Sequence, residues 1–149
     1  MTQDVLEERQ GEASPWKEMR AGRFLDRIGP LLAARDDGAW RYGLRVDDSH
    51  TNPVGLVHGG VIFSLIDHAI ALVAWEAADR HAAVTLQLDT RFLETARAGD
   101  LLEAGARLRH RTHSLLFLDA DVTVGGRPIA AASAIMKLAG KGAGHRDER

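Results

Sequence analysis

The longest apolar segment of the chain runs from His58 to about Ala78 and limits the possible folds more than any other feature. It is rich in Ala, Leu and Ile and is too long for a strand, so we expect a helix. Apolar residues occur on almost every side, which predicts a helix that is buried nearly all round. A single twisted sheet can cover only one side of such a helix. We therefore expect a second protomer to supply the remaining cover.

Strand-like segments lie on both sides of this helix. Leu31–Ala33 and the alternating run Trp40–Val46 precede it, joined by a hairpin-type turn at Asp36-Asp37-Gly38. Four further runs follow the helix: Val84–Arg91, Leu101–Arg111, Leu115–Val124 and Ile129–Leu138. The glycine-containing turns between these runs favour antiparallel neighbours. This order predicts an α+β fold in which an antiparallel sheet wraps around one long central helix.

The two ends of the chain differ from its middle. We expect residues 1–23 to form an N-terminal extension, of which the first 14 or so are charged, lack apolar periodicity and are mobile. Ser14-Pro15-Trp16 has the pattern of a helix start, which predicts a short helix to about Arg20. Residues 24–139 then form one domain, and residues 140–149 form a disordered tail.

Composition excludes several classes of protein. The chain has no cysteine, so it has no disulfide framework, thiolate nucleophile or Cys-based zinc site. His110 and His113 would point to opposite faces of a strand, so we expect no metal site there. The start lacks the pattern of a secretory signal, and no run approaches the length of a membrane span. A net charge of -2 gives no reason to expect nucleic acid, so we expect a cytoplasmic protein.

Asp67 is the unusual residue of the apolar helix. Asp is a poor helix former and is almost never fully buried without a partner. An unpaired carboxylate in an apolar interior costs roughly several kcal/mol. Two explanations fit the residue pattern equally well: a role in chemistry, or a structural ion pair or cap.

Gly59 and Gly60 stand where the helix should begin. The first N–H groups of a helix lack intrahelical acceptors and, with the helix dipole, stabilise negative charge. In acyl transfer such N–H groups form an oxyanion site. The glycine pair could also serve only to allow a tight turn from loop to helix.

Four motifs in one order carry a family resemblance: NPVGLVHGGVIFSLID from Asn52, VTLQLDTRFL from Val84, ARAGD from Ala96 and GRPIAAASA from Gly126. Together they resemble the hotdog-fold thioesterases of the PaaI type, including relatives of 4-hydroxybenzoyl-CoA thioesterase. The resemblance covers nearly the whole span from residue 24 to 138. It implies hydrolysis of an acyl-CoA, with coenzyme A as part of the substrate and no cofactor. An aromatic acyl group, such as phenylacetyl or hydroxybenzoyl, is expected slightly ahead of a medium-chain one.

The resemblance also implies roles for individual residues. Asp67 would be the nucleophile or general base, Gly59 would supply the oxyanion N–H, and Asn52 would orient the thioester or water. Thr85 occupies the place of the family's Ser or Thr on the strand after the helix. His58, beside the glycines, would contact the substrate or shape the loop.

Two further residues are candidates for substrate binding. Gly60 continues the bare start of the helix, where a substrate could approach the backbone closely. Arg91 is one of several arginines that could bind the phosphates of coenzyme A.

The spacing of Gly59 and Asp67 also bears on whether one chain can form the active site. They are eight positions apart, so on one helix their backbones lie about 12 Å apart along the axis. A carbonyl attacked by Asp67, or by water that it holds, must keep its oxygen roughly 3 Å from the oxyanion donor. One helix cannot readily supply both groups. We therefore expect a homo-oligomer, a dimer or tetramer, with active sites between subunits.

Two other functions are compatible with a hotdog fold. One is hydration or dehydration of an enoyl thioester, which in such enzymes uses a His and an acidic residue in different motifs. The other is a non-catalytic acyl-CoA-binding module. Serine esterase chemistry is not expected, because neither Ser64 nor Ser114 lies in a G-x-S-x-G motif.

Overall fold

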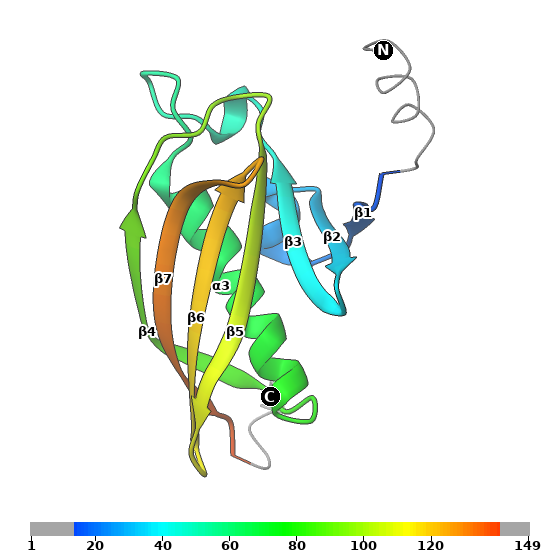
Figure 1. Ribbon diagram of the computed structural model, residues 1–149, viewed down its shortest axis with the longest axis vertical. Helices are drawn as coiled ribbons and strands as arrows, with labels where there is room; N and C mark the ends of the chain where they lie inside the picture. Colours follow the sequence, from blue (N-terminus) through cyan, green and yellow to red (C-terminus); the bar gives the residue numbers. More distant parts are fainter. Residues whose placement is uncertain (1–13, 141–149) are drawn as a thin grey trace, which may run out of the picture.

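The computed structural model describes residues 14–140, in which one antiparallel sheet of seven strands curves around a single long helix (Figure 1). The strand order is β1-β2-β3-β5-β6-β7-β4. The strands are β1 (Lys17–Met19), β2 (Leu31–Asp36), β3 (Ala39–Arg45), β4 (Ala83–Phe92), β5 (Leu101–Arg111), β6 (Leu115–Val124) and β7 (Arg127–Leu138). The helices are α2 (Arg23–Ile28), the short 3-10 helix η1 (Asp48–His50) and α3 (Gly59–Ala77). The predicted α+β architecture is confirmed.

The N-terminal segment differs from the prediction. The short helix expected from Ser14 to Arg20 is wrong: residues 17–19 form β1, which pairs with β2 and so belongs to the sheet. The ring of Trp16 packs closely over Gly43 of β3, and this contact holds the segment against the sheet. Packing and strand pairing therefore outweigh the local helix signal in this segment. Residues 1–13 and 141–149, predicted to be mobile and disordered, lie outside the described residues.

Two tight turns fix the register of two hairpins, β2–β3 and β6–β7. Asp37 and Gly38 both have positive φ, at 49° and 80°, between the paired residues of β2 and β3. Gly125 and Gly126 repeat the pattern between β6 and β7, at 55° and 81°. Positive φ at both central residues is the conformation that matches the twist of a hairpin. Asp and Gly are the residues that adopt it most readily, so the sequence signal at Asp36–Gly38 is confirmed.

The long helix α3 packs on the sheet with one stripe of its surface. The stripe repeats at helical spacing and contains Ile62, Leu65, Ile66, Ala69, Ile70 and Ala74. Within one chain the rest of the helix surface is only partly covered: Phe63 and Trp75 are each 40% exposed. The helix is therefore not buried all round by its own sheet.

The apolar composition of α3 has a second consequence. By length and composition alone, its 19 residues are enough to cross a membrane, so the prediction that no run approaches that length is wrong for this helix. The buried stripe on the sheet gives the simpler explanation, because a core helix passes the same test.

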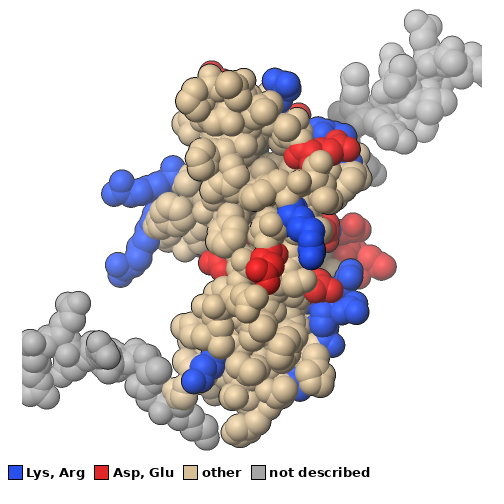
Figure 2. All heavy atoms as spheres, turned by 90° about the vertical axis from the view of Figure 1, so that its left-hand side faces the viewer, with Lys and Arg blue, Asp and Glu red and all other residues tan. Residues whose placement is uncertain are grey.

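The strand β4 forms one edge of the sheet. Among the described residues it pairs only with β7, which leaves its other side open. Four large apolar residues on or just beyond it are more than half exposed: Val84, Leu86, Phe92 and Leu93. Figure 2 views this side of the molecule and shows a surface made mostly of uncharged residues. A long, open and apolar edge strand is a surface that other chains can pair with.

Candidate active site

Asp67 lies halfway along α3, beside the buried stripe of the helix and within reach of the edge strand β4. Its side chain is half-buried, and its Oδ1 accepts a hydrogen bond of 2.8 Å from the hydroxyl of Thr85 on β4. No ion pair to Asp67 is found among residues 14–140, so the structural alternative of a salt bridge has no support. A single hydroxyl donor fixes one carboxylate oxygen and leaves the other available.

A β-bulge brings Thr85 to this carboxylate. The register of β4 against β7 shifts between Thr85 and Gln87, so simple alternation fails there. Without the bulge, Thr85 would share a face with Gln87 and Asp89, which line a hollow on the outer side of the sheet. With it, Thr85 faces α3, as do Leu88 and Phe92 further along the strand. Bulges commonly redirect a side chain next to a functional site.

The start of α3 presents one free backbone donor. His58 is the N-cap, and its Nδ1 accepts a hydrogen bond of 2.9 Å from the N–H of Gly60. The N–H of Gly59 has no acceptor in the part of the chain that the structure describes. Of the two glycines, Gly59 thus keeps the N–H that an oxyanion needs, whereas the N–H of Gly60 is already bonded.

The capping hydrogen bond also defines the state of the His58 ring. Because Nδ1 accepts a hydrogen bond, the neutral ring carries its proton on Nε2. The side chain is exposed, so Nε2 is a donor that a ligand could use. His58 therefore shapes the start of the helix and can still contact a substrate.

Asn52 organises the loop that leads to α3. Its side-chain Oδ1 accepts hydrogen bonds from the N–H groups of Val54 and Leu56, at 3.1 and 3.0 Å. Its main chain adds a bond of 2.7 Å from its N–H to the carbonyl of Leu56. This is the local turn chemistry that Asn favours. Among residues 14–140, the amide NH₂ of Asn52 has no hydrogen-bond acceptor and remains available as a donor.

Gly59 and Asp67 do not meet within one chain. They lie eight residues apart on one uninterrupted helix, and about 12 Å separates their backbones. Each has a different neighbour on β4: Thr85 near one end of the strand contacts Asp67, and the ring of Phe92 at the other end lies against Gly59. The structure therefore brings Thr85 together with Asp67 and leaves Gly59, His58 and Asn52 as a separate group.

A cavity of about 470 Å³ lies beside Asp67, between α2 and α3. Phe24 and Leu25 of α2 form one wall, and Phe63 and Ala71 of α3 form another. The part played by Phe24 was not foreseen from the sequence, because the helix was predicted to end before that residue. Two phenyl rings and a carboxylate thus border one apolar space.

His68 follows Asp67 but has a different environment. It is 7% exposed and packs edge-on against the ring of Tyr42, with ring centroids 5.3 Å apart. Burial lowers the pKa of His68, and the Asp67 carboxylate acts in the opposite direction. Burial also raises the pKa of Tyr42 to about 12, with a contribution from Glu76. Both rings are thus uncharged at neutral pH and act as packing residues.

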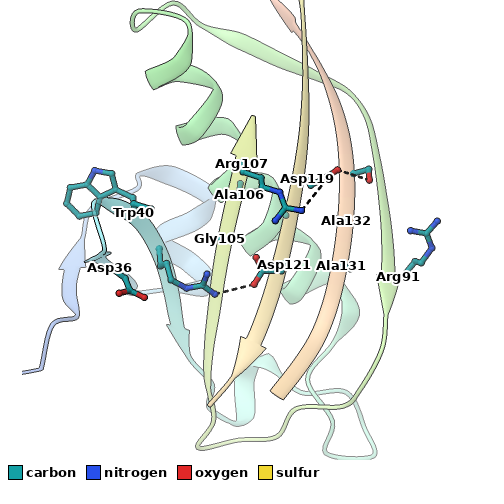
Figure 3. A pocket seen from close by; sticks show the side chains of 14 residues that line it. Asp36, Trp40, Arg91, Gly105, Ala106, Arg107, Asp119, Asp121, Ala131 and Ala132 are labelled. Atoms are coloured by element: carbon teal, nitrogen blue, oxygen red, sulfur yellow. Dashed lines mark hydrogen bonds and ion pairs between the residues drawn. The ribbon is translucent and has the colours of Figure 1, made fainter. Parts of the chain in front are cut away.

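Arg91 lies apart from the other candidates. It lines a hollow of about 510 Å³ on the face of the sheet that points away from α3 (Figure 3). Ion pairs such as Arg41–Asp121 and Arg107–Asp119 cross this hollow, whereas Arg91 extends at its side without joining them. Within one subunit Arg91 therefore cannot act together with Asp67.

Metal ligands are not clustered in the described region. Between residues 14 and 140, no group of three or more His, Asp or Glu side chains is placed to hold a metal ion.

Comparisons with known proteins identify the family of the chain. A family model described as the thioesterase superfamily matches residues 54–131. A putative esterase, PA0474 of Pseudomonas aeruginosa, is 32% identical over 123 residues, which cover 80% of this chain and 90% of that protein. Human acyl-coenzyme A thioesterase 13 is 27% identical over 110 residues, which cover 72% of this chain and 78% of the relative.

A solved structure is also similar. The protein smu.793 of Streptococcus mutans, bound to acetyl CoA, has 26% identity and a TM-score of 0.68, with 83% of this chain and 98% of that chain covered. The chain belongs to the thioesterase superfamily and has the hotdog fold. The resemblance seen in the sequence is confirmed.

The buried state of His68 predicts a dependence of stability on pH. Because its pKa is lower in the folded protein than the ordinary 6.5, the unfolded chain binds a proton at higher pH. The stability from neutral His68 is complete above that value and is lost as the pH falls through the folded pKa. Between about pH 7.5 and about pH 5, the wild type should lose more free energy of unfolding than His68→Asn, measured by urea denaturation at one protein concentration.

The exposed His113 provides a control. His113→Asn should keep the pH profile of the wild type. If His68→Asn also followed the wild-type profile, the burial of an uncharged imidazole would not contribute to the pH dependence.

Proposed function

We propose that the protein is an acyl-CoA thioesterase whose active sites form between two subunits. The observation that carries the proposal is the carboxylate of Asp67, fixed at 2.8 Å by Thr85 and placed beside an apolar cavity. A fixed carboxylate next to a space for an acyl group is the equipment that thioester hydrolysis needs. Two relatives support the proposal. One is named for acyl-coenzyme A thioesterase activity, and the other, smu.793, is bound to acetyl CoA.

Asp67 acts as the general base in this proposal. It takes a proton from a water molecule as the water oxygen bonds to the carbonyl carbon of the thioester. The carbonyl oxygen becomes an oxyanion, the C–S bond then breaks, and the thiolate of coenzyme A takes the proton from Asp67. Thr85 donates to Oδ1 throughout, so that Oδ2 is directed at the water. The products are a free acid and coenzyme A.

The N–H of Gly59 stabilises the oxyanion. It is unbonded within the described chain and lies at the positive end of the α3 dipole. The free NH₂ of Asn52 and the Nε2–H of His58 belong to the same loop and can hold the thioester or the water. Gly60 has no side chain and is exposed, so the substrate can pass close to the backbone.

A dimer through β4 would complete the site. Its open edge can pair antiparallel with the same edge of a second subunit about a two-fold axis. Thr85 lies near one end of β4 and Phe92 at the other, so such pairing brings Asp67 of one subunit towards Gly59 of its partner. The same contact covers the exposed apolar residues of β4 and the uncovered face of α3.

The walls of the cavity favour an aromatic acyl group. Phe24 and Phe63 border the space beside Asp67, and aromatic rings pack well against each other in offset or edge-on geometry. Phenylacetyl-CoA and hydroxybenzoyl-CoA are therefore the first substrates to test, with medium-chain acyl-CoA next. In an oligomer, Arg91 of a neighbouring subunit can contribute to binding the phosphates of coenzyme A, although Arg91 is remote from Asp67 of its own chain.

Replacing the proposed base should abolish most of the activity. Asp67→Asn keeps the size of the side chain and the acceptor for Thr85, but cannot take a proton from water. We expect kcat to fall by about 10²–10⁴-fold, measured as release of thiol from a panel of aromatic and medium-chain acyl-CoA substrates. Wild-type protein that consumed enoyl-CoA without releasing thiol would instead be a hydratase, and protein that only bound acyl-CoA would be a binding module.

Asp36→Asn is the matched control for this experiment. Asp36 is exposed at the end of β2 and lines the hollow on the outer face, away from Asp67. It should retain the kcat of the wild type. Near-normal kcat in a folded Asp67→Asn protein would remove Asp67 from the mechanism.

The oxyanion donor can be removed by a single substitution. Gly59→Pro deletes the free N–H at the first position of α3, where Pro is compatible with a helix. His58 has ψ 133°, which suits a residue that precedes Pro. We expect kcat to fall by about 10²–10³-fold, the effect of losing one oxyanion donor.

Gly59→Ala separates loss of the donor from crowding. Its Cβ would approach the Phe92 ring to 3.3 Å, a contact that the proline also makes, but the N–H is kept. This variant should stay within about tenfold of the wild-type kcat, since only packing at Phe92 changes. Equal losses in the two variants would show that crowding, and not the N–H, explains the effect.

A further inference from the structure

We propose that His50 is a positioning residue that holds the loop carrying Gly59 in a fixed relation to α2. The inference rests on the proposed function, because it concerns the oxyanion donor and the wall of the acyl cavity. His50 does not touch the expected position of the reacting atoms. It acts through two segments that border the proposed site: the loop before Gly59 and the helix α2.

Both ring nitrogens of His50 are used. The side chain is buried, at 4% exposure, and Nδ1 accepts a hydrogen bond of 2.9 Å from the N–H of Asp47. The neutral ring therefore carries its proton on Nε2, which donates to the carbonyl oxygen of Ile28, 2.5 Å away. One imidazole thus bonds to the start of its own loop and to the last residue of α2.

The main chain of His50 bonds to the residue next to the proposed oxyanion donor. Its carbonyl accepts a hydrogen bond of 2.9 Å from the N–H of His58, the residue directly before Gly59. The bridge between Thr51 and Val57 closes the loop beside this bond. A shift of His50 would therefore be passed to the first turn of α3, where the donor lies.

The α2 helix depends on this contact more than a well-packed helix would. None of its six residues is fully buried. In the described part of the chain, the bond from His50 to Ile28 is the one hydrogen bond that reaches α2 from a distant segment. Phe24 and Leu25 of this helix form a wall of the cavity beside Asp67. His50 thus links the oxyanion loop to the acyl cavity.

Two substitutions separate the two bonds of the ring. In His50→Gln, the amide nitrogen can take the place of Nε2 and keep the bond to Ile28, while the bond from Asp47 is lost. In His50→Asn, the amide oxygen can take the place of Nδ1 and keep the bond from Asp47, while the bond to Ile28 is lost. Each of the two variants thus loses one of the two hydrogen bonds of the His50 ring and keeps the other.

The expected result is a split between kcat and KM. His50→Gln loosens the oxyanion loop, so kcat should fall by about tenfold or more with KM within about threefold. His50→Asn releases α2, so KM for the acyl-CoA should rise by about fivefold or more with kcat within about threefold. A residue with a merely structural role would lower the stability of both variants and would not separate the two constants.

Amide hydrogen exchange gives a second readout that does not depend on activity. Residues 54–62 should exchange faster in His50→Gln than in His50→Asn, and residues 22–28 should show the reverse order. If the wild type hydrolyses no acyl-CoA, the proposed function fails and the exchange pattern alone decides the role of His50.

Either readout can overturn the proposal. Folded variants with the kcat and KM of the wild type, or with equal changes in both constants, would contradict it. Identical exchange in the two segments would contradict it as well. If one variant does not fold, the other still tests its own bond against the wild type.

Discussion

The stiffness of α3 is the constraint on which the candidate site depends. Asp67 and Gly59 lie on the same unbroken helix, so about 12 Å always separates their backbones. A thioester carbonyl cannot contact both groups of one chain when its oxygen must lie about 3 Å from the donor. The proposed catalysis therefore requires a second copy of the chain. The uncovered face of α3 and the open edge of β4 are the surfaces that we propose for its contact.

The edge strand β4 contacts both parts of the proposed site, Asp67 and Gly59, with its two ends. Near one end its Thr85 holds the carboxylate of Asp67, and at the other end its Phe92 covers Gly59. A strand that pairs with its own copy in antiparallel direction places opposite ends next to each other. The element that would form the dimer is therefore also the element that orders the carboxylate. Dimer formation and activity should depend on the same residues.

The loop before α3 and the helix α2 complete this arrangement. Asn52 folds the loop through its side-chain oxygen, and His58 caps the helix while leaving Gly59 unbonded. His50 connects the loop to α2, whose Phe24 borders the cavity. Most polar side chains of the region are thus occupied in fixing backbone, so few groups remain free for the substrate. These free groups are the ones that we expect to bind the substrate or take part in the reaction.

Much of the fold could be predicted from the sequence because its signals are local. The hairpin at Asp37-Gly38, the alternating strands and the apolar helix each depend on residues close together in the chain. Asp67 and Gly59 are candidates for the same reason: a carboxylate in an apolar helix and a glycine at a helix start are both visible in the local sequence. The rest depends on tertiary contacts. β1 follows from Trp16 packing on Gly43, a distant residue.

Other features of the site could not be predicted from local sequence patterns either. The position of Thr85 was carried over from the family pattern, but the alternation of β4 would have placed its hydroxyl on the outer face, and only the bulge against β7 corrects this. Phe24 borders the cavity because a helix, α2, begins after Gly22, whereas the sequence predicts a helix only to about Arg20. Arg91 has the right chemistry for phosphate but lies across the sheet from Asp67.

Complementation between two inactive variants tests the shared site most directly. In a mixed dimer of Gly59→Pro and Asp67→Asn, one site combines the intact Asp67 of the first subunit with the intact Gly59 of the second. The other site carries both defects. Random mixing makes half of the dimers mixed, so activity should recover to about a quarter of the wild-type value. If the mixture, with exchange of subunits verified, stayed as inactive as the separate variants, Asp67 and Gly59 would not act across the dimer.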